Sequence, residues 1–106
     1  MIIATTDDLP DKQILETFGL VRGNAVRARH LGKDIGAALK GLVGGEISEY
    51  TKLMGEVREQ ALDRMCEQAR GRGANAIVAL RFANTEIAAG AAEILAYGTA
   101  VRVAKE

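Results

Sequence analysis

Residues 46–72 have the hydrophobic pattern of one long amphipathic helix. Their apolar residues recur in steps of three and four and therefore fall along one side of such a helix: Ile47, Tyr50, Met54, Val57, Ala61, Met65 and Ala69. At 1.5 Å per residue a helix of this length would be about 40 Å long. A chain of 106 residues has room for a single domain, 1–106, so any sheet it forms must lie against this helix.

Both ends of this helix carry recognisable signals. Glu46 and Glu49 fall in the first turns, where the helix dipole favours negative charge, and Gly71 and Gly73 provide the stop. Gly55 lies inside the helix and costs about 1 kcal/mol relative to alanine. We therefore expect close packing at Gly55, either within the chain or against a neighbouring subunit.

The remaining segments predict four strands and one further helix. Residues 1–6 favour a short strand, and 13–29 a long bent strand interrupted by glycines. Residues 31–43 have helical spacing and end at a glycine pair. The order is completed by strands at 76–82 and 92–103, joined by a loop.

That loop is predicted at 83–91, which contains Asn84, Thr85 and Gly90. The resulting order, β-β-α-α-β-β, predicts an α+β fold with a mainly antiparallel sheet packed on one face by the long helix.

Both faces of this sheet are expected to be apolar. Alternation predicts that Val78, Leu80 and Phe82 share one side of their strand. Across the sheet, Phe82, Tyr97 and Val101 are assigned to one face, and Ile77, Ile94, Ala96 and Ala100 to the other. Two consecutive helices can cover only one face, and monomers rarely expose a large apolar patch. We therefore predict a homo-oligomer.

Composition argues against several classes of partner. The 14 basic and 14 acidic residues cancel, and only 4% of residues are aromatic, so neither a nucleic acid nor an anionic membrane is an expected partner. The only cysteine, Cys66, gives no sign of an oxidising compartment. The first ten residues lack the pattern of a signal peptide. These features together predict a cytoplasmic protein.

Four segments carry a resemblance to a known family. They are Thr17-Phe-Gly-Leu-Val-Arg-Gly-Asn-Ala-Val-Arg-Ala-Arg29, Glu56-x-Arg58-x-x-Ala61-x-x-Arg64-Met65, Gly73-Ala-Asn-Ala-Ile-Val78 and Ala96-Tyr-Gly-Thr-Ala-Val101. In this order, and over nearly the whole chain, they resemble the YbjQ-like family of small bacterial and archaeal proteins. The resemblance implies a fold related to dodecin subunits and a pentameric ring. Members are described as uncharacterised or heavy-metal-binding, and no catalytic residues are established that could be transferred.

A metal site within one subunit is not favoured by the sequence. Soft-metal transport domains hold the ion with a Cys-x-x-Cys pair, whereas the corresponding loop, 6–10, has no cysteine. In a ring, symmetric copies of His30, or of Asp7 with Asp8, could converge on an ion. That alternative stays open, and the cofactor is unknown.

The other candidate site is a cationic cluster formed by Arg27, Arg29 and His30, which could bind a phosphate or carboxylate near the start of the following helix. The same residues could instead form a solvated strand end paired with acidic side chains of the long helix. Because Cys66 is near the C-terminal end of that helix, where the dipole disfavours a thiolate, we expect it to be a packing residue.

No catalytic constellation is identifiable. Residues 41–45 superficially resemble a phosphate loop but lack the Lys-Ser/Thr pair. The sequence therefore leaves three hypotheses: a non-enzymatic ring that binds a small ligand or metal ion between subunits, a structural or partner-binding oligomer without a ligand, and an enzyme with a site shared between subunits.

Overall fold

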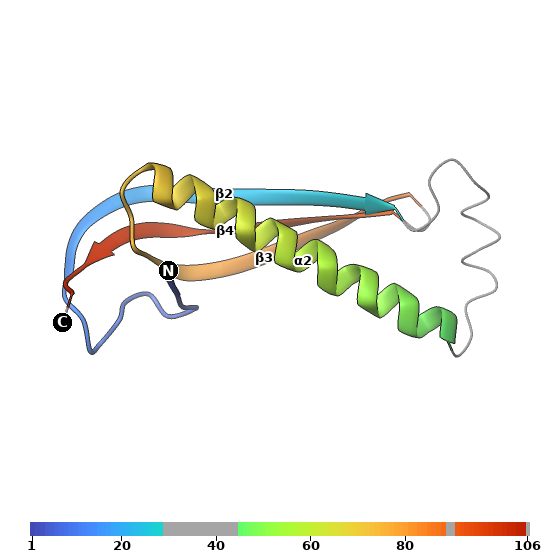
Figure 1. The fold of residues 1–106 in the computed structure, drawn as a ribbon, viewed down its shortest axis with the longest axis horizontal. Coiled ribbons are helices and arrows are strands. Elements are labelled where there is room, and N and C mark those ends of the chain that lie inside the picture. The colour runs from blue at the N-terminus through green and yellow to red at the C-terminus, as the bar shows by residue number, and fades with distance from the viewer. Residues whose placement is uncertain (29–44, 89–90, 106) are drawn as a thin grey trace.

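The computed structural model describes residues 1–28, 45–88 and 91–105, which form a four-stranded sheet with a long helix across one face (Figure 1). The strands are β1 (Ile2–Ile3), β2 (Ile14–Ala28), β3 (Ala76–Ala88) and β4 (Ala91–Val103), and the helix is α2 (Gly45–Gly71). Their order in the sheet is β1-β3-β4-β2, with β1 parallel to β3 and the other neighbours antiparallel. The predicted α+β class is confirmed, with a mixed rather than wholly antiparallel sheet.

The long elements match the sequence prediction closely, and the hairpin does not. The helix predicted at 46–72 is α2, and the strand predicted at 13–29 is β2. The helix predicted at 31–43 lies outside the described residues. The loop predicted at 83–91 is wrong for 83–88, because β3 continues to Ala88. Pairing with β4, such as Ala83 with Leu95, gives this polar stretch a partner that overrides its weak strand propensity.

The main core lies between α2 and the sheet. Val57, Ala61 and Met65 are fully buried on the helix side and pack against a sheet surface of small and branched side chains. That surface comprises Val21, Ala25, Ile77, Leu80, Ile94, Ala96 and Ala100. A Cβ atom on Gly23 would overlap the backbone of Ala61 and Met65, so the absence of a side chain lets the helix approach β2 closely. Among the described residues, the expected close packing at Gly55 does not occur, because a Cβ there would meet only the tip of Arg58 at 3.7 Å.

The C-terminal end of α2 is capped by a Schellman motif. Gly73 has φ +92°, and its N–H donates to the carbonyl oxygen of Arg70 at 3.0 Å. The N–H of Ala74 donates to the carbonyl oxygen of Ala69, also at 3.0 Å. These bonds satisfy carbonyls that the helix leaves unpaired, and Ala69 and Ala74 both join the core. The predicted stop is therefore made by Gly73.

A bulge in β3 reverses the predicted order of side chains. Ala79 has φ +56°, and its N–H donates to the carbonyl oxygen of Thr6 at 2.7 Å, while that of Leu80 donates to Ala4 at 3.0 Å. The register with β4 shifts between Val78 and Arg81. Leu80 consequently joins the helix-side core, whereas Val78 belongs to a separate cluster on the other face.

The assignment of Phe82 to the face of Tyr97 is therefore wrong. Phe82 pairs directly with Ala96, and directly opposed residues of an antiparallel pair point to the same side. At the bulge two residues of β3 lie opposite one residue of β4, and strict alternation does not predict this extra residue.

The second face of the sheet, the one opposite α2, has a covered part and an open part. At one end Leu9 and Ile14 pack over a small cluster made of Ala76, Val78, Val101 and Val103. The prediction of a bare second face implied that Val101 is exposed, but the chain itself buries this residue. Farther along, Leu20 and Val26 are 56% and 52% exposed. The open part of this face is smaller and more polar than alternation predicts.

The outer edge of β2 is closed by side chains of α2 and by Arg72, the residue that follows it. Arg64 Nη1 donates to the carbonyl oxygen of Asn24, and Arg72 Nη1 to that of Leu20, both at 2.7 Å. Between them, the N–H of Arg22 donates to Gln68 Oε1 at 2.8 Å. The three residues are spaced i, i+4 and i+8, so they line one side of α2 and its C-terminal end. They satisfy strand groups that would otherwise offer a template for another strand.

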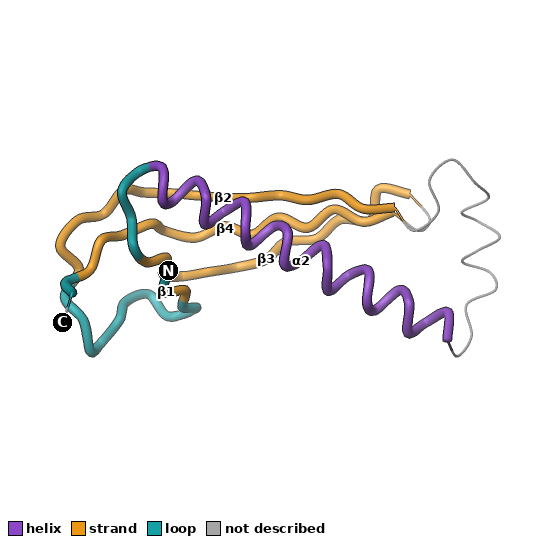
Figure 2. Tube along the Cα trace, in the orientation of Figure 1, coloured by secondary structure: helices purple, strands orange, loops and turns teal. Residues whose placement is uncertain are grey.

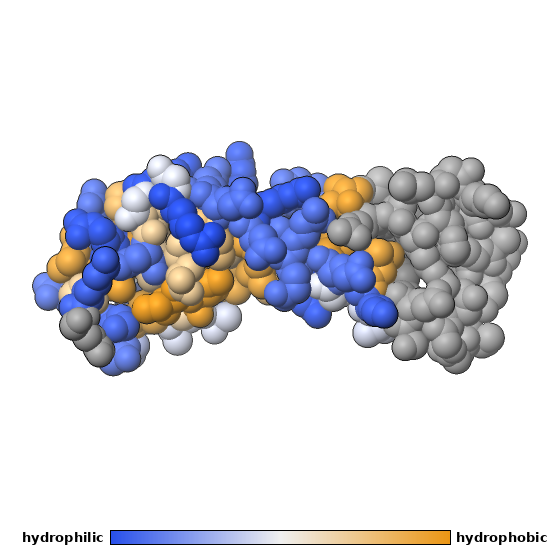
Figure 3. All heavy atoms as spheres, in the orientation of Figure 1, coloured by the Kyte–Doolittle hydropathy of each residue, from blue (hydrophilic) through white to orange (hydrophobic). Residues whose placement is uncertain are grey.

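The two halves of α2 differ in how they meet the sheet. Figure 2 shows the C-terminal half lying along β2, whereas the N-terminal half diverges from the strands. Taken as a whole, α2 packs mainly on β2 and β4 and only slightly on β3. Figure 3 shows a hydrophilic outer surface on α2 with hydrophobic side chains on either side of it.

Candidate functional site

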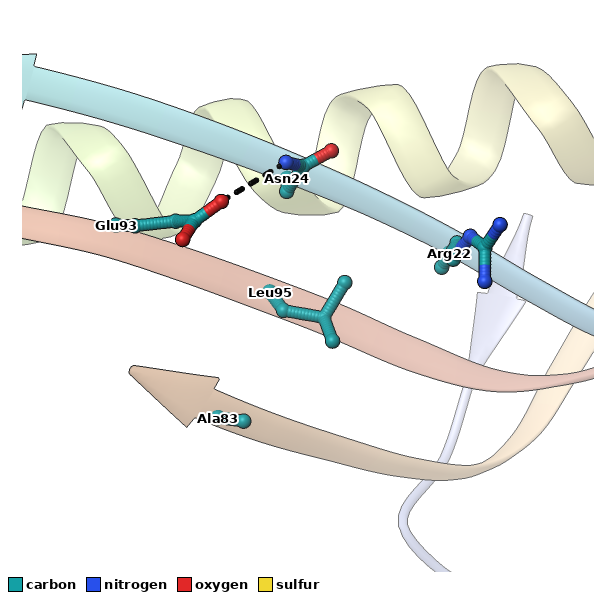
Figure 4. Close-up of a pocket in the computed structure, with 5 residues that line it drawn as sticks. All are labelled: Arg22, Asn24, Ala83, Glu93 and Leu95. Carbon is teal, nitrogen blue, oxygen red and sulfur yellow. Dashed lines mark hydrogen bonds between the residues drawn. The ribbon is translucent and has the colours of Figure 1, made fainter. Parts of the chain in front are cut away.

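A pocket on the open part of the second face is the candidate site. It has a volume of about 440 Å³ and is lined by Arg22 and Asn24 of β2, Ala83 of β3, and Glu93 and Leu95 of β4 (Figure 4). We call it the sheet-face pocket. Arg22 and Asn24 share one side of β2 because alternate residues of a strand point the same way. Their partners in β4 bring Leu95 and Tyr97 to the same face.

The polar side chains of the sheet-face pocket are held in different ways. Asn24 Nδ2 donates to Glu93 Oε2 at 3.1 Å, which orients the carboxylate across the two strands. The backbone of Arg22 is fixed to α2 through Gln68, but its guanidinium has no hydrogen bond or ion pair to another described residue. In Figure 4 Arg22 lies toward one end of the pocket and Glu93 toward the other, with Leu95 between them.

This arrangement suits binding better than catalysis. The guanidinium offers a planar fork of donors to a carboxylate or phosphate, and the oriented carboxylate of Glu93 can accept from a cation. Leu95 and Ala83 give an apolar floor. Among the described residues that line the pocket there is no serine, cysteine or histidine, so these residues do not pair a nucleophile with a base.

The predicted cationic cluster falls largely outside the described residues, so the structure does not test it. Arg27 lies in β2, where its backbone pairs with Ala92, while Arg29 and His30 lie outside the described residues. The cationic cluster thus stays a prediction. Sequence reasoning missed Arg22, Asn24 and Glu93. The alternation of Arg22 and Asn24 in β2 was a usable signal, but Glu93 joins them only because β2 pairs with β4, and that strand order was not predicted.

Metal-ligating residues are dispersed within the described part of the chain. Residues 1–28, 45–88 and 91–105 contain no group of three or more histidine, cysteine, aspartate or glutamate side chains placed to hold an ion. Asp7 and Asp8 lie in the segment between β1 and β2. Over the same residues, no helix has both the length and the apolar character needed to cross a membrane.

Cys66 has the packing role predicted for it. Its side chain is buried in the main core together with Met65 and Ala69. Burial raises the pKa of the Cys66 thiol, an effect that the nearby positive charge of Arg70 partly offsets. A buried, protonated thiol is a poor nucleophile.

Comparison with known proteins identifies the family. A family model described as "Putative heavy-metal-binding" and named YbjQ_1 matches residues 1–104. The chain belongs to the YbjQ-like family. A relative from Streptomyces coelicolor is 54% identical over 106 residues, covering 100% of both chains. Another from Methanosarcina acetivorans is 53% identical over 103 residues, covering 97% of both. Both are named UPF0145 proteins, a name that states no activity.

A solved structure shows the same fold. It is a protein of unknown function from Pediococcus pentosaceus, assigned to the DUF74 family, with a TM-score of 0.65 over 98% of each chain and 15% sequence identity. At that identity the likeness concerns the fold alone. The YbjQ-like assignment therefore confirms the resemblance seen in the sequence, and the function must be argued from this chain's own residues.

Proposed function

We propose that this YbjQ-like protein is a cytoplasmic, non-enzymatic homo-oligomer that binds a small ligand at a boundary between subunits. The ring form, a pentamer, comes from the family resemblance. The observation that carries the proposal is the sheet-face pocket, where the unpaired guanidinium of Arg22 and the oriented carboxylate of Glu93 lie on the same face as the exposed Leu20 and Val26.

Exposed apolar side chains beside fixed polar groups are typical of surfaces that associate. Leu20 and Val26 belong to the same side of β2 as Arg22 and Asn24 because all four alternate along the strand. A second copy that covers these two side chains would also enclose the pocket. Enclosure would lower the local dielectric and strengthen the interaction of Arg22 with an anionic group.

The assembly is tested by sedimentation of the wild type and of the double variant Leu20→Ser/Val26→Ser. The wild type should sediment as an oligomer at micromolar concentration, and the double variant should shift toward the monomer. Leu15→Ser is a matched control, because Leu15 is also an exposed leucine of β2, at 48%, and lies outside the pocket. A monomeric wild type would refute the assembly.

Ligand binding is tested by thermal shift, since a ligand selective for the native state raises the melting temperature. Zinc, copper(II), flavin mononucleotide and a panel of amino acids supply metals, a cofactor and dipolar ligands. A probe that binds the sheet-face pocket should lose its effect in Arg22→Gln or Glu93→Gln. If no probe shifts the wild type, the alternative of a purely structural or partner-binding oligomer is favoured.

The metal hypothesis has a direct test of its own. The family description invites it, but one subunit offers no ready-made ligand set among its described residues. Symmetric copies meeting at an axis could supply one. Elemental analysis of the protein as isolated should then find metal in a fixed ratio to the oligomer, and its absence together with a null zinc and copper shift would rule this reading out.

A further inference from the structure

A second cavity lies between α2 and the strands β3 and β4, on the face of the sheet opposite the sheet-face pocket. It has a volume of about 270 Å³ and is lined by Met54 and Arg58 of α2, Phe82 and Asn84 of β3, and Ile94 of β4. We call it the wedge cleft. It exists because α2 diverges from the sheet at this point (Figure 2).

The apolar part of the wedge cleft suits a flat ring. Ile94 forms a buried floor, 4% exposed, while Phe82 is 42% exposed although the Ala79 bulge turns it to the helix side. Met54 is half-buried opposite it. An aromatic group bound here could stack on Phe82 and contact the polarisable sulfur of Met54.

The polar part of the wedge cleft suits an anion. Arg58 is the only charged residue among the five that line it. Within the described part of the chain, the side chains of Arg58 and Asn84 make no hydrogen bond or ion pair, whereas Arg64 of the same helix and Arg72 just beyond it are bound to β2. A planar guanidinium without a protein partner is matched in shape and charge by a carboxylate.

We propose that the wedge cleft binds a planar aromatic carboxylate, with its ring against Phe82 and Met54, its carboxylate on Arg58 and the amide of Asn84 beside it. At ~30 Å³ for each water, the cavity has the volume of about nine waters. A ligand of roughly 10–15 non-hydrogen atoms would fill a similar volume. The site shares no residue with the sheet-face pocket, so it stands or falls separately from the function proposed above.

The test uses 2-naphthoate, whose fluorescence anisotropy rises when it binds a protein. The wild type should bind it saturably, with Kd on the order of 0.1–1 mM for a probe of this size. Arg58→Gln should raise Kd at least about tenfold, and Arg58→Lys by less, because lysine keeps the charge but loses the bidentate fork. Phe82→Ala should weaken binding as well, through lost stacking.

Two controls separate this site from general surface binding. Arg70→Gln removes the same charge from an exposed position of α2, about 18 Å along the helix from Arg58 at 1.5 Å per residue, and should leave Kd within about twofold, because exposed charges that far apart are screened. The neutral analogue 2-naphthalenemethanol should bind at least about tenfold more weakly than 2-naphthoate. Circular dichroism checks that each variant is folded.

Three outcomes would overturn the proposal. One is a wild type that shows no saturable binding, as expected if a second copy fills the cleft. Another is an Arg58→Gln variant that binds like the wild type. The third is equal weakening by Arg70→Gln, which would indicate non-specific attraction to positive charge.

Discussion

The two faces of the sheet are built from the same strands but have opposite characters. On the helix side, Val21 and Ala25 of β2 are buried against α2, and Gly23 lets the helix backbone come close. On the second face, Leu20 and Val26 of the same strand are more than half exposed. Alternation along one strand therefore separates residues that hold the fold together from residues that are available to a partner.

This comparison teaches where each property should be sought. Around Val21, Gly23 and Ala25 the helix side has little space and no polar side chains, so changes at these positions should act on stability. The second face has the sheet-face pocket and exposed side chains, so changes there should act on association and binding. Paired substitutions within β2 and within α2 can test that division directly.

The largest effect is expected at Gly23. Gly23→Val should lower the free energy of unfolding by about 3 kcal/mol or more, because the new side chain would overlap the backbone of Ala61 and Met65. Gly55→Ala is the control in α2, where a Cβ has room, and it should raise stability by about 0.5–1 kcal/mol through helix propensity. Urea unfolding measures both, and a mild Gly23→Val would mean that the helix does not dock closely on β2.

A matched pair of valines compares the two faces directly. Val21→Thr should cost about 1–3 kcal/mol because it places a hydroxyl in the dry core. Val26→Thr, in the same strand but 52% exposed, should change stability by less than about 0.5 kcal/mol. Thermal unfolding at low protein concentration distinguishes them, and similar losses in both variants would show that the second face is as buried as the first.

Opening the outer edge of β2 by substitution should cause a smaller loss of stability and a new tendency to associate. Arg64→Met/Arg72→Met removes two hydrogen bonds to backbone carbonyls and should lower the free energy of unfolding by about 1–3 kcal/mol in total. Freed carbonyls at an exposed edge should also promote strand-to-strand aggregation, measured by light scattering. Arg70→Met removes one charge without a bond to β2 and should do neither.

The smallest effect is a pH dependence from Cys66. Because burial raises the pKa of this thiol in the folded protein, the native state keeps its proton to higher pH than the unfolded state does. Its contribution to stability is therefore fully present below the unfolded pKa, about 8.5, and is lost as pH rises above it. Cys66→Ala should flatten the stability curve above that pH, and an unchanged slope would contradict this.

Local patterns predicted the elements that depend on local physics. The spacing of apolar residues indicated α2 to within a residue at each end, and Gly73 was correctly placed at its stop. A long helix of amphipathic sequence needs no knowledge of its partners to be recognised. The buried role of Cys66 followed in the same way from its position on the helix.

Features that depend on pairing between distant segments could not be predicted. The extension of β3 through Thr85 and Glu86 requires β4 as a partner, and the reversal at Ala79 depends on hydrogen bonds that β3 donates to the carbonyl oxygens of Thr6 and Ala4. The sheet-face pocket combines three strands, so its residues are scattered in the sequence. The cationic cluster at Arg27, Arg29 and His30 could be proposed because its members are sequence neighbours.

The bulge at Ala79 shifts the alternation of side chains along β3. Up to Val78 the side chains follow one phase of alternation, and beyond it they follow the other. Removing Ala79 would leave a single residue opposite Gly98, so the ladder would become regular and Phe82 would keep its pairing with Ala96 on the helix side. In a chain of this length it is the bulge that places Leu80 and Phe82, and not their neighbours, on the helix side.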